Sequence, residues 1–257
     1  MIRLFPSVVG VLLALSGTNT YAQDCEAASR EVAEDLRGVA IVADQAGAFR
    51  RAFEHGRKAL ASCPDSETPW YALIRAAELG FGQFPVQVSG QSVASAIEAA
   101  RQAAARQPGS VRILTVLARL EGKVPLARDA DSRQPAYAPA RVALAAALVE
   151  AGEAREALAL LKSTPALEAT PGTHTIRARA LIALGRPRDA VAEARRDRDG
   201  SWPDAPEPFL MAAVRRDAEE ALGHALLADH RSKEAAVHLR AAAALGSAKA
   251  AALLKSR

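Results

Sequence analysis

The sequence has few aromatic residues, and most of its apolar residues are small or unbranched. Only 4% of its 257 residues are Phe, Trp or Tyr, although 50% are hydrophobic, and Ala and Leu dominate that half. Ala and Leu lose little side-chain freedom in a helix. The composition therefore predicts helices over strands, and the small side chains allow those helices to pack closely.

The mature chain lacks an apolar run long enough to cross a membrane. The one long run, residues 4–16, covers about 13 residues, follows Arg3 and precedes the small-residue cleavage pattern of Thr20 and Ala22. We predict that residues 1–22 are a signal peptide cut after Ala22, and that the mature protein is periplasmic or secreted, without membrane insertion. An uncleaved anchor is the alternative, but the run falls short of the roughly 20 residues that span a bilayer.

The chain also lacks blocks of one charge and signatures of catalysis. Its 33 Lys and Arg residues face 29 Asp and Glu residues, and the two signs are interspersed, which is typical of a solvated surface. We therefore predict no nucleic-acid partner. No G-x-S-x-G, P-loop, H-E-x-x-H or G-x-G-x-x-G motif is present. The sequence accordingly predicts a protein without enzymatic activity, catalytic residues or cofactor.

Histidines and adjacent carboxylates give no metal or acid–base signature either. The five histidines are His55, His174, His224, His230 and His238. The last three follow one another at intervals that do not match metal-ligand spacing, so we interpret all five as helix-surface residues and predict no metal site. Glu219 and Glu220 point in different directions from one helix, which favours solvated carboxylates over acid–base chemistry.

Only two cysteines are present, Cys25 and Cys63. If residues 26–44 form one helix and residues 49–62 the next, with Gly47 in the turn, both cysteines lie at the open end of an antiparallel hairpin. We predict a disulfide between them, which persists in an oxidising compartment and stabilises the hairpin by roughly 4 kcal/mol. Without a C-x-x-C motif or a basic partner, a catalytic role for either cysteine is the weaker alternative.

Four segments share the same five-residue interval between a turn residue and an alanine. The pairs are Gly47 and Ala52, Gly152 and Ala157, Gly185 and Ala190, and His230 and Ala235. Gly supplies the positive φ that ends a helix, and Ala lets the next helix pack closely. Ala157 and Ala190 are about 33 residues apart, a period typical of helical arrays. We predict an inserted loop at residues 80–92 and breaks at residues 124–139 and 199–208.

These hairpins resemble tetratricopeptide repeats, whose helices carry a Trp-x2-Leu-Gly-x2-Tyr face followed by Ala, a bulky residue, Ala and Pro. The matching residues are Trp70, Leu73, Ala96 and Pro108 in one repeat, Leu144, Leu148, Ala157 and Leu161 in another, and Leu222, Gly223, Leu226, Ala235 and Leu239 in a third. The last 25 or so residues also resemble a Sel1-like repeat, with Gly246 between two alanine-rich helices.

The resemblance implies an all-α, right-handed superhelical solenoid of antiparallel helix pairs over residues 23–257. The degenerate repeats lie at about 26–66, 67–109, 110–136, 137–170, 171–203 and 208–257. Trp70 and Trp202 are expected to pack in the core and between repeats.

The resemblance also implies a concave groove that binds peptides or partner domains. In related repeats, the residue after the small position of the first helix faces this groove. Carried over, these residues are Arg75, Arg119, Ala146, Arg179 and His224, with Tyr71 and Glu220 beside them. Such arginines favour an acidic peptide or a chain-terminal carboxylate, whereas arginines that bridge repeats on a wet surface are the alternative. The carboxylate clamp of chaperone-binding repeats needs paired Asn and Lys, and it is absent because Asn19 is the only asparagine.

The expected function is that of an exported protein-interaction module, a periplasmic adaptor or assembly factor that holds a partner segment in its groove. The first alternative is an accessory subunit that contacts an envelope enzyme through its convex face or the 80–92 loop. The second is a glycan-active enzyme on an α-superhelix, for which no carboxylate pair stands out. The sequence leaves the oligomeric state open.

Overall fold

The computed structural model describes residues 27, 30–31, 45–81, 93–200 and 208–256, and all regular structure in these ranges is helical. The elements are α2 (Gln45–Ser62), α3 (Glu67–Phe81), α5 (Val93–Arg106), α6 (Val111–Glu121), α7 (Val124–Arg133), α8 (Ala138–Glu150), α9 (Ala154–Lys162), the short 3-10 helix η1 (Pro165–Ala169), α10 (Thr173–Ala183), α11 (Pro187–Asp199), α12 (Pro208–Ala228), α13 (Ser232–Ala244) and α14 (Ala248–Lys255).

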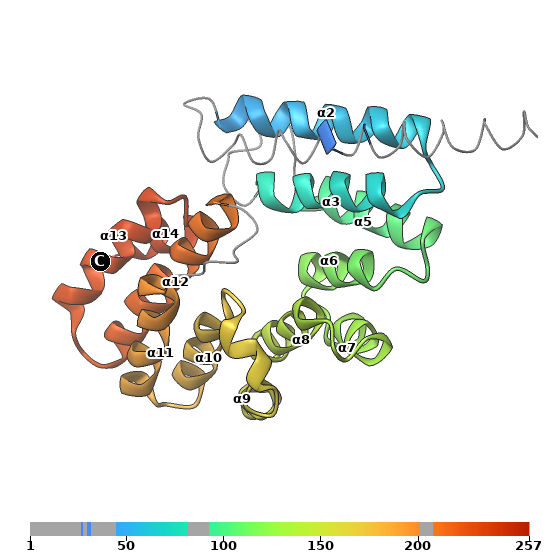
Figure 1. The fold of residues 1–257 in the computed structure, drawn as a ribbon. Coiled ribbons are helices and arrows are strands. Elements are labelled where there is room, and N and C mark those ends of the chain that lie inside the picture. Colours follow the sequence, from blue (N-terminus) through green and yellow to red (C-terminus); the bar gives the residue numbers. More distant parts are fainter. Residues whose placement is uncertain (1–26, 28–29, 32–44, 82–92, 201–207, 257) are drawn as a thin grey trace, which may run out of the picture.

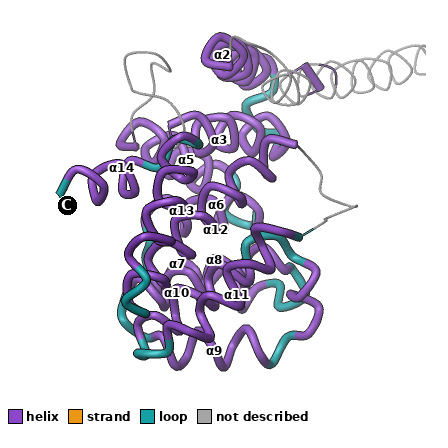
Figure 2. The backbone as a smooth tube through the Cα atoms, turned by 90° about the vertical axis from the view of Figure 1, so that its left-hand side faces the viewer, coloured by secondary structure: helices purple, strands orange, loops and turns teal. Residues whose placement is uncertain are grey.

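The helices stack as antiparallel pairs into an arc (Figure 1). The first helices of the pairs, α3, α6, α8, α10 and α12, contact one another in that order. Each second helix, α5, α7, α9, α11 or α13, packs on its own first helix and on the helix that follows. Figure 1 shows the first helices on the inner side of the arc, here called the concave face, and α7, α9, α11 and α13 on the outer, convex side. Figure 2 shows the stack from the side, with α2 at the top and α9 at the bottom. The predicted all-α solenoid is confirmed.

Small residues fill much of the space between the helices. In the core formed by α10 to α13, Ala178, Ala190, Ala225 and Ala235 are all fully buried. Because Ala extends no further than Cβ, the helix backbones approach closely. Trp70 adds a large buried side chain near the start of the arc, where its Nε1 donates to the carbonyl oxygen of Pro64 at 2.7 Å. The predicted core role of Trp70 is confirmed.

Three of the four predicted turn residues adopt the left-handed conformation that ends a helix. Gly152 has φ of 84°, Gly185 of 72° and His230 of 62°. After each of them, the next backbone N–H donates to a carbonyl in the last turn of the preceding helix, as Glu153 does to Leu148 at 2.8 Å. This hydrogen bond satisfies a carbonyl that the helix leaves without a partner, so the shared interval in the sequence marks real helix ends.

The structure corrects the other predicted interruptions. Gly47 lies inside α2, which begins at Gln45, because the roughly 1 kcal/mol cost of one Gly is small within a run of good helix formers. The predicted break at 124–139 contains α7, since Pro125 lies in the first turn, where a proline's missing N–H would have no partner. Helix α3 continues to Phe81, beyond the predicted start of the loop.

Several predictions fall outside the described residues: the signal peptide and its cleavage site, Cys25, Trp202 and the 82–92 part of the loop. Cys63 is buried directly after α2, and its disulfide with Cys25 stays a prediction. None of the helices in the described ranges combines the length and hydrophobicity that crossing a membrane requires. The Sel1-like character of the last two helices also stays a prediction.

Candidate functional site: the concave face

The predicted groove residues all lie on first helices of the pairs, and they divide into two groups. The placements are Tyr71 and Arg75 on α3, Arg119 on α6, Ala146 on α8, Arg179 on α10, and Glu220 and His224 on α12. Contacts of these side chains form one cluster before α8 and another after it. The structure therefore places the candidates on the inner helices. Tyr71 and Arg119 join one cluster, Arg179, Glu220 and His224 join another, and neither cluster as defined below includes Arg75 or Ala146. That these residues bind a partner stays a prediction.

The first site, here called the aromatic cluster, consists of Tyr71, Arg112, Arg119 and Tyr137. The guanidinium carbon of Arg112 lies 3.9 Å from the centroid of the Tyr71 ring. Nη1 of Arg112 is also 3.8 Å from Oε1 of Glu67, and 48% of the Arg112 side chain is exposed. A guanidinium stacked on a ring keeps its in-plane N–H donors, so Arg112 is positioned to bind an anion.

Tyr137 joins the aromatic cluster from the turn before α8. Burial raises the pKa of Tyr137, the charge and hydrogen bonding of Tyr71 raise it further, and Arg112 and Arg119 lower it. The hydrogen bond with Tyr71 joins Tyr137 to the other ring, and the charges of Arg112 and Arg119 act on its hydroxyl. The turn is held by the N–H of Tyr137, which donates to the carbonyl oxygen of Gln134 at 2.9 Å. With its raised pKa, the phenol stays protonated at neutral pH and keeps a proton to donate.

The second site, here called the histidine cluster, consists of Arg179, Glu220, His224, Ser247 and Lys249. Oγ of Ser247 donates to Oε2 of Glu220 at 2.6 Å, and Nη2 of Arg179 lies 3.7 Å from Oε1. Burial lowers the pKa of His224, Glu220 opposes that shift, and Arg179 and Lys249 add to it. His224 is therefore neutral at neutral pH, and Arg179 lies beside the buried carboxylate of Glu220.

The interpretation of Glu219 and Glu220 as solvated is wrong. They do point in different directions, but both are buried. Oε2 of Glu219 lies 2.7 Å from Nδ1 of His238 on α13, and Glu220 accepts the hydrogen bond from Ser247 before α14. Because a buried carboxylate needs a partner, each of the two later helices supplies one.

The interpretation of every histidine as a surface residue is also wrong for His174. This residue is buried on α10, and its Nδ1 lies 2.8 Å from Oε2 of Glu193 on α11. The same helix pair buries Asp197, which accepts the N–H groups of Gly172 at 3.2 Å and Thr175 at 2.5 Å. These groups hold α10 against α11. Within the described part of the chain, no group of three or more potential ligands is arranged to hold a metal ion.

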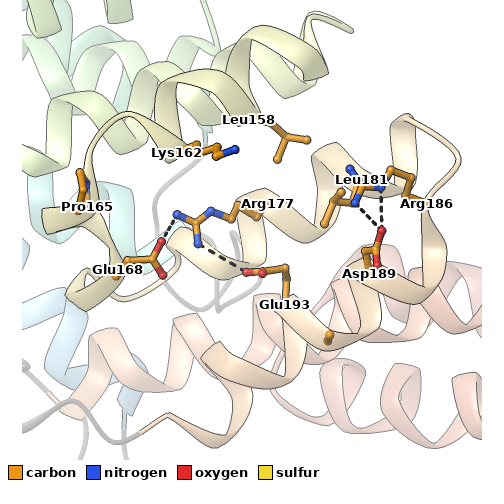
Figure 3. Close-up of a pocket in the computed structure, with 10 residues that line it drawn as sticks. Leu158, Lys162, Pro165, Glu168, Arg177, Leu181, Arg186, Asp189 and Glu193 are labelled. Carbon is orange, nitrogen blue, oxygen red and sulfur yellow. Dashed lines mark hydrogen bonds and ion pairs between the residues drawn. The ribbon is translucent and has the colours of Figure 1, made fainter.

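The convex side offers one alternative site, an open hollow of about 480 Å³ between α9, η1, α10 and α11 (Figure 3). Its lining residues are Leu158, Lys162, Pro165, Glu168, Arg177, Leu181, Arg186, Asp189, Ala192 and Glu193. Arg177 pairs with Glu168 and with Glu193, and Arg186 pairs with Asp189 at 2.7 Å. These ion pairs neutralise most of the charge in the hollow, which leaves it little to recognise a charged ligand.

Four residues of the two clusters were missed in the sequence. Arg112 precedes Arg119 by two helical turns and so shares its face of α6, a signal that was present but unused. Tyr137 lies in the segment that was read as a break. Ser247 and Lys249 lie at the start of the last helix, which packs on α13 and reaches α12 through the hydrogen bond from Ser247 to Glu220.

Comparison with known proteins supports the fold. No protein-family model and no curated protein matches this chain. Among solved structures, the crystal structure of a thermophilic tetratricopeptide-repeat protein of Thermus thermophilus is similar, with a TM-score of 0.50 and 21% identity. The likeness covers 71% of this chain and 98% of that one. It shows the fold alone, and it confirms that this chain is a tetratricopeptide-repeat-like solenoid.

Proposed function

We propose that this protein is a non-enzymatic interaction module that binds an acidic segment of a partner protein on its concave face. The observation that carries the proposal is the pair of cationic clusters on that face, contributed by α3, α6, α10, α12 and the start of α14. Stacked helix pairs present such an extended face to partners, and the fold supports this use of it.

Charge favours an acidic partner. The cations of the two clusters are Arg112, Arg119, Arg179 and Lys249; Arg112 lies 3.8 Å from Glu67 and Arg179 lies 3.7 Å from Glu220. Each cluster therefore offers cationic side chains with which an acidic segment can pair. Guanidinium groups bind carboxylates through two parallel hydrogen bonds, which also fix the orientation of the bound side chain.

The finer proposal is an exported adaptor or assembly factor. The predicted signal peptide and the predicted disulfide between Cys25 and Cys63 both support export to an oxidising compartment. The role of adaptor follows from a face that binds and a sequence without catalytic signatures. The alternative is an accessory subunit that contacts its enzyme through the convex hollow. The experiment described next distinguishes this role from that of an adaptor.

The test is in-cell crosslinking and affinity capture with the full chain expressed in its native host. The concave variant carries Arg112→Glu and Arg179→Glu, one reversal in each cluster. The matched control carries Arg155→Glu and Arg195→Glu, two exposed arginines on the convex helices α9 and α11, with the same change in net charge.

We expect one partner to be captured by the wild type and the control and lost in the concave variant. Loss in the control alone would move the contact to the convex side and favour the accessory subunit. Equal capture by all three proteins, or no specific partner in any of them, would contradict the proposal.

A further inference from the structure

The middle of α8, between Arg141 and Glu150, carries no charge and separates the two clusters. Residues 142–149 of α8 are all Val, Ala or Leu, and Ala146, the predicted groove residue of this repeat, is half-buried. The aromatic cluster lies on the α6 side of this stretch and the histidine cluster on the α10 side. The buried residues of this stretch belong to the core, so a ligand that reaches both clusters passes over the partly exposed Val142, Ala146 and Val149, a small, apolar middle.

The spacing of the helices sets the length of such a ligand. Packed helices lie about 8–10 Å apart, and the concave face crosses three such steps from α6 through α8 and α10 to α12. The path is therefore about 24–30 Å along the face. An extended chain covers about 3.3–3.6 Å per residue, and the inner side of a curved arc is the shorter path, so about seven residues bridge the clusters.

We infer that the concave face binds an extended protein segment with two acidic positions about seven residues apart and small apolar residues between them. The inference rests on the proposed function and specifies its ligand. A helical segment does not fit, because seven residues of α-helix rise only about 10 Å, less than half of the path.

Each cluster has donors for one acidic position. At the aromatic cluster, Arg112 presents the edge of its stacked guanidinium, and Arg119 and the hydroxyl of Tyr137 lie beside it. At the histidine cluster, Arg179 is 3.7 Å from Glu220, too long for a hydrogen bond, so its donors can turn to a ligand. Lys249 is exposed at the start of α14, and its charge acts on His224.

The probes that test the inference are fluorescein-labelled peptides, each with two Asp-Asp pairs and identical net charge. The pairs are separated by one, six or twelve Ala and Gly residues. We expect the six-residue spacer to bind about tenfold more tightly than the one-residue spacer, which reaches only one cluster. The twelve-residue spacer should lose only about twofold to threefold, because a longer loop costs little extra entropy.

Variants show whether both clusters hold the same probe. Arg112→Glu and Lys249→Glu should each weaken the six-residue probe about tenfold, and the convex control Arg155→Glu should leave its affinity unchanged. Binding should also raise the pKa of His224, measured by NMR titration of its imidazole, because an anion then offsets Arg179 and Lys249. Circular dichroism confirms that each variant stays folded.

Equal affinity for the one-residue and six-residue probes, or no binding of the six-residue probe, overturns the inference. So does a six-residue probe that responds to a reversal in only one cluster. Failure of the proposed function gives a different pattern. If a cellular partner is lost in the concave variant while the probes show no dependence on spacing, the proposed function stands and the two-site ligand is wrong.

Discussion

Gly223 lies where α13 packs so closely on α12 that no room remains for a methyl group. A Cβ at this position would lie 2.7 Å from both Cγ and Cδ2 of Leu239, well inside the 3.4 Å at which ordinary contacts begin. Leu239 is 1% exposed and has no space into which to retreat. We therefore expect Gly223→Ala to move the two helices apart.

The magnitude is the balance of two effects. In an unobstructed helix interior, replacing Gly by Ala stabilises a protein by about 1 kcal/mol. Forcing an extra methyl group into a packed core costs about 1–3 kcal/mol. Because this Cβ would overlap two carbon atoms of a buried side chain, the cost lies toward the upper end. The expected net result is destabilisation by about 1–2 kcal/mol.

A double-mutant cycle tests this reasoning, because the effect of Gly223→Ala on stability should change sign once Leu239 is replaced by Ala. Leu239→Ala alone should destabilise by about 2–5 kcal/mol, because it leaves a cavity. In that background the obstruction is gone, so adding Gly223→Ala should stabilise by about 1 kcal/mol. Urea unfolding followed by far-UV circular dichroism measures all four proteins. Gly109→Ala is the control, because no atom lies within 4 Å of its Cβ position.

The refuting result is specific. If Gly223→Ala stabilises the otherwise unchanged protein, α12 and α13 do not approach as closely as described. Because Gly223 adjoins His224, the same displacement should also weaken binding of the six-residue probe. A destabilised variant that binds this probe normally would show that the histidine cluster does not depend on this packing.

Two further predictions concern stability, and a third concerns the disulfide. Asp197→Ala should lower the free energy of unfolding by about 2–3 kcal/mol in urea, because the N–H groups of Gly172 and Thr175 lose a buried acceptor. Burial lowers the pKa of His224 below 6.5, so the unfolded chain binds its proton more readily. Stability should then fall as pH decreases from about 6.5, and His224→Gln should reduce that slope in acid titrations, whereas an unchanged slope would contradict the assignment. If Cys63 is paired with Cys25, the protein isolated from its native host should gain about 2 Da on reduction, and an unchanged mass would exclude the disulfide.

Local signals in the sequence were enough to determine the class of fold. Alanine and leucine specify helices, and the interval between a turn residue and the next small residue identifies where helices end, as at Gly152, Gly185 and His230. These signals work because helix formation and helix termination depend on residues a few positions apart. The same locality explains the errors at Gly47 and Pro125, where the neighbouring residues or the position within the first turn outweighed a helix breaker.

The composition of the two candidate clusters was decided by tertiary structure. The sequence indicated which helix positions face one side, so Tyr71, Arg179 and His224 were identified. It gave no sign that α14 would bring Lys249 to His224, or that helix pairing would bury Glu219 and Glu220 beside partners from later helices. The periodicity of a helix reports the direction of a side chain. Whether that side chain meets a charge, a ring or solvent depends on distant helices, whose positions only the packing of the whole arc determines.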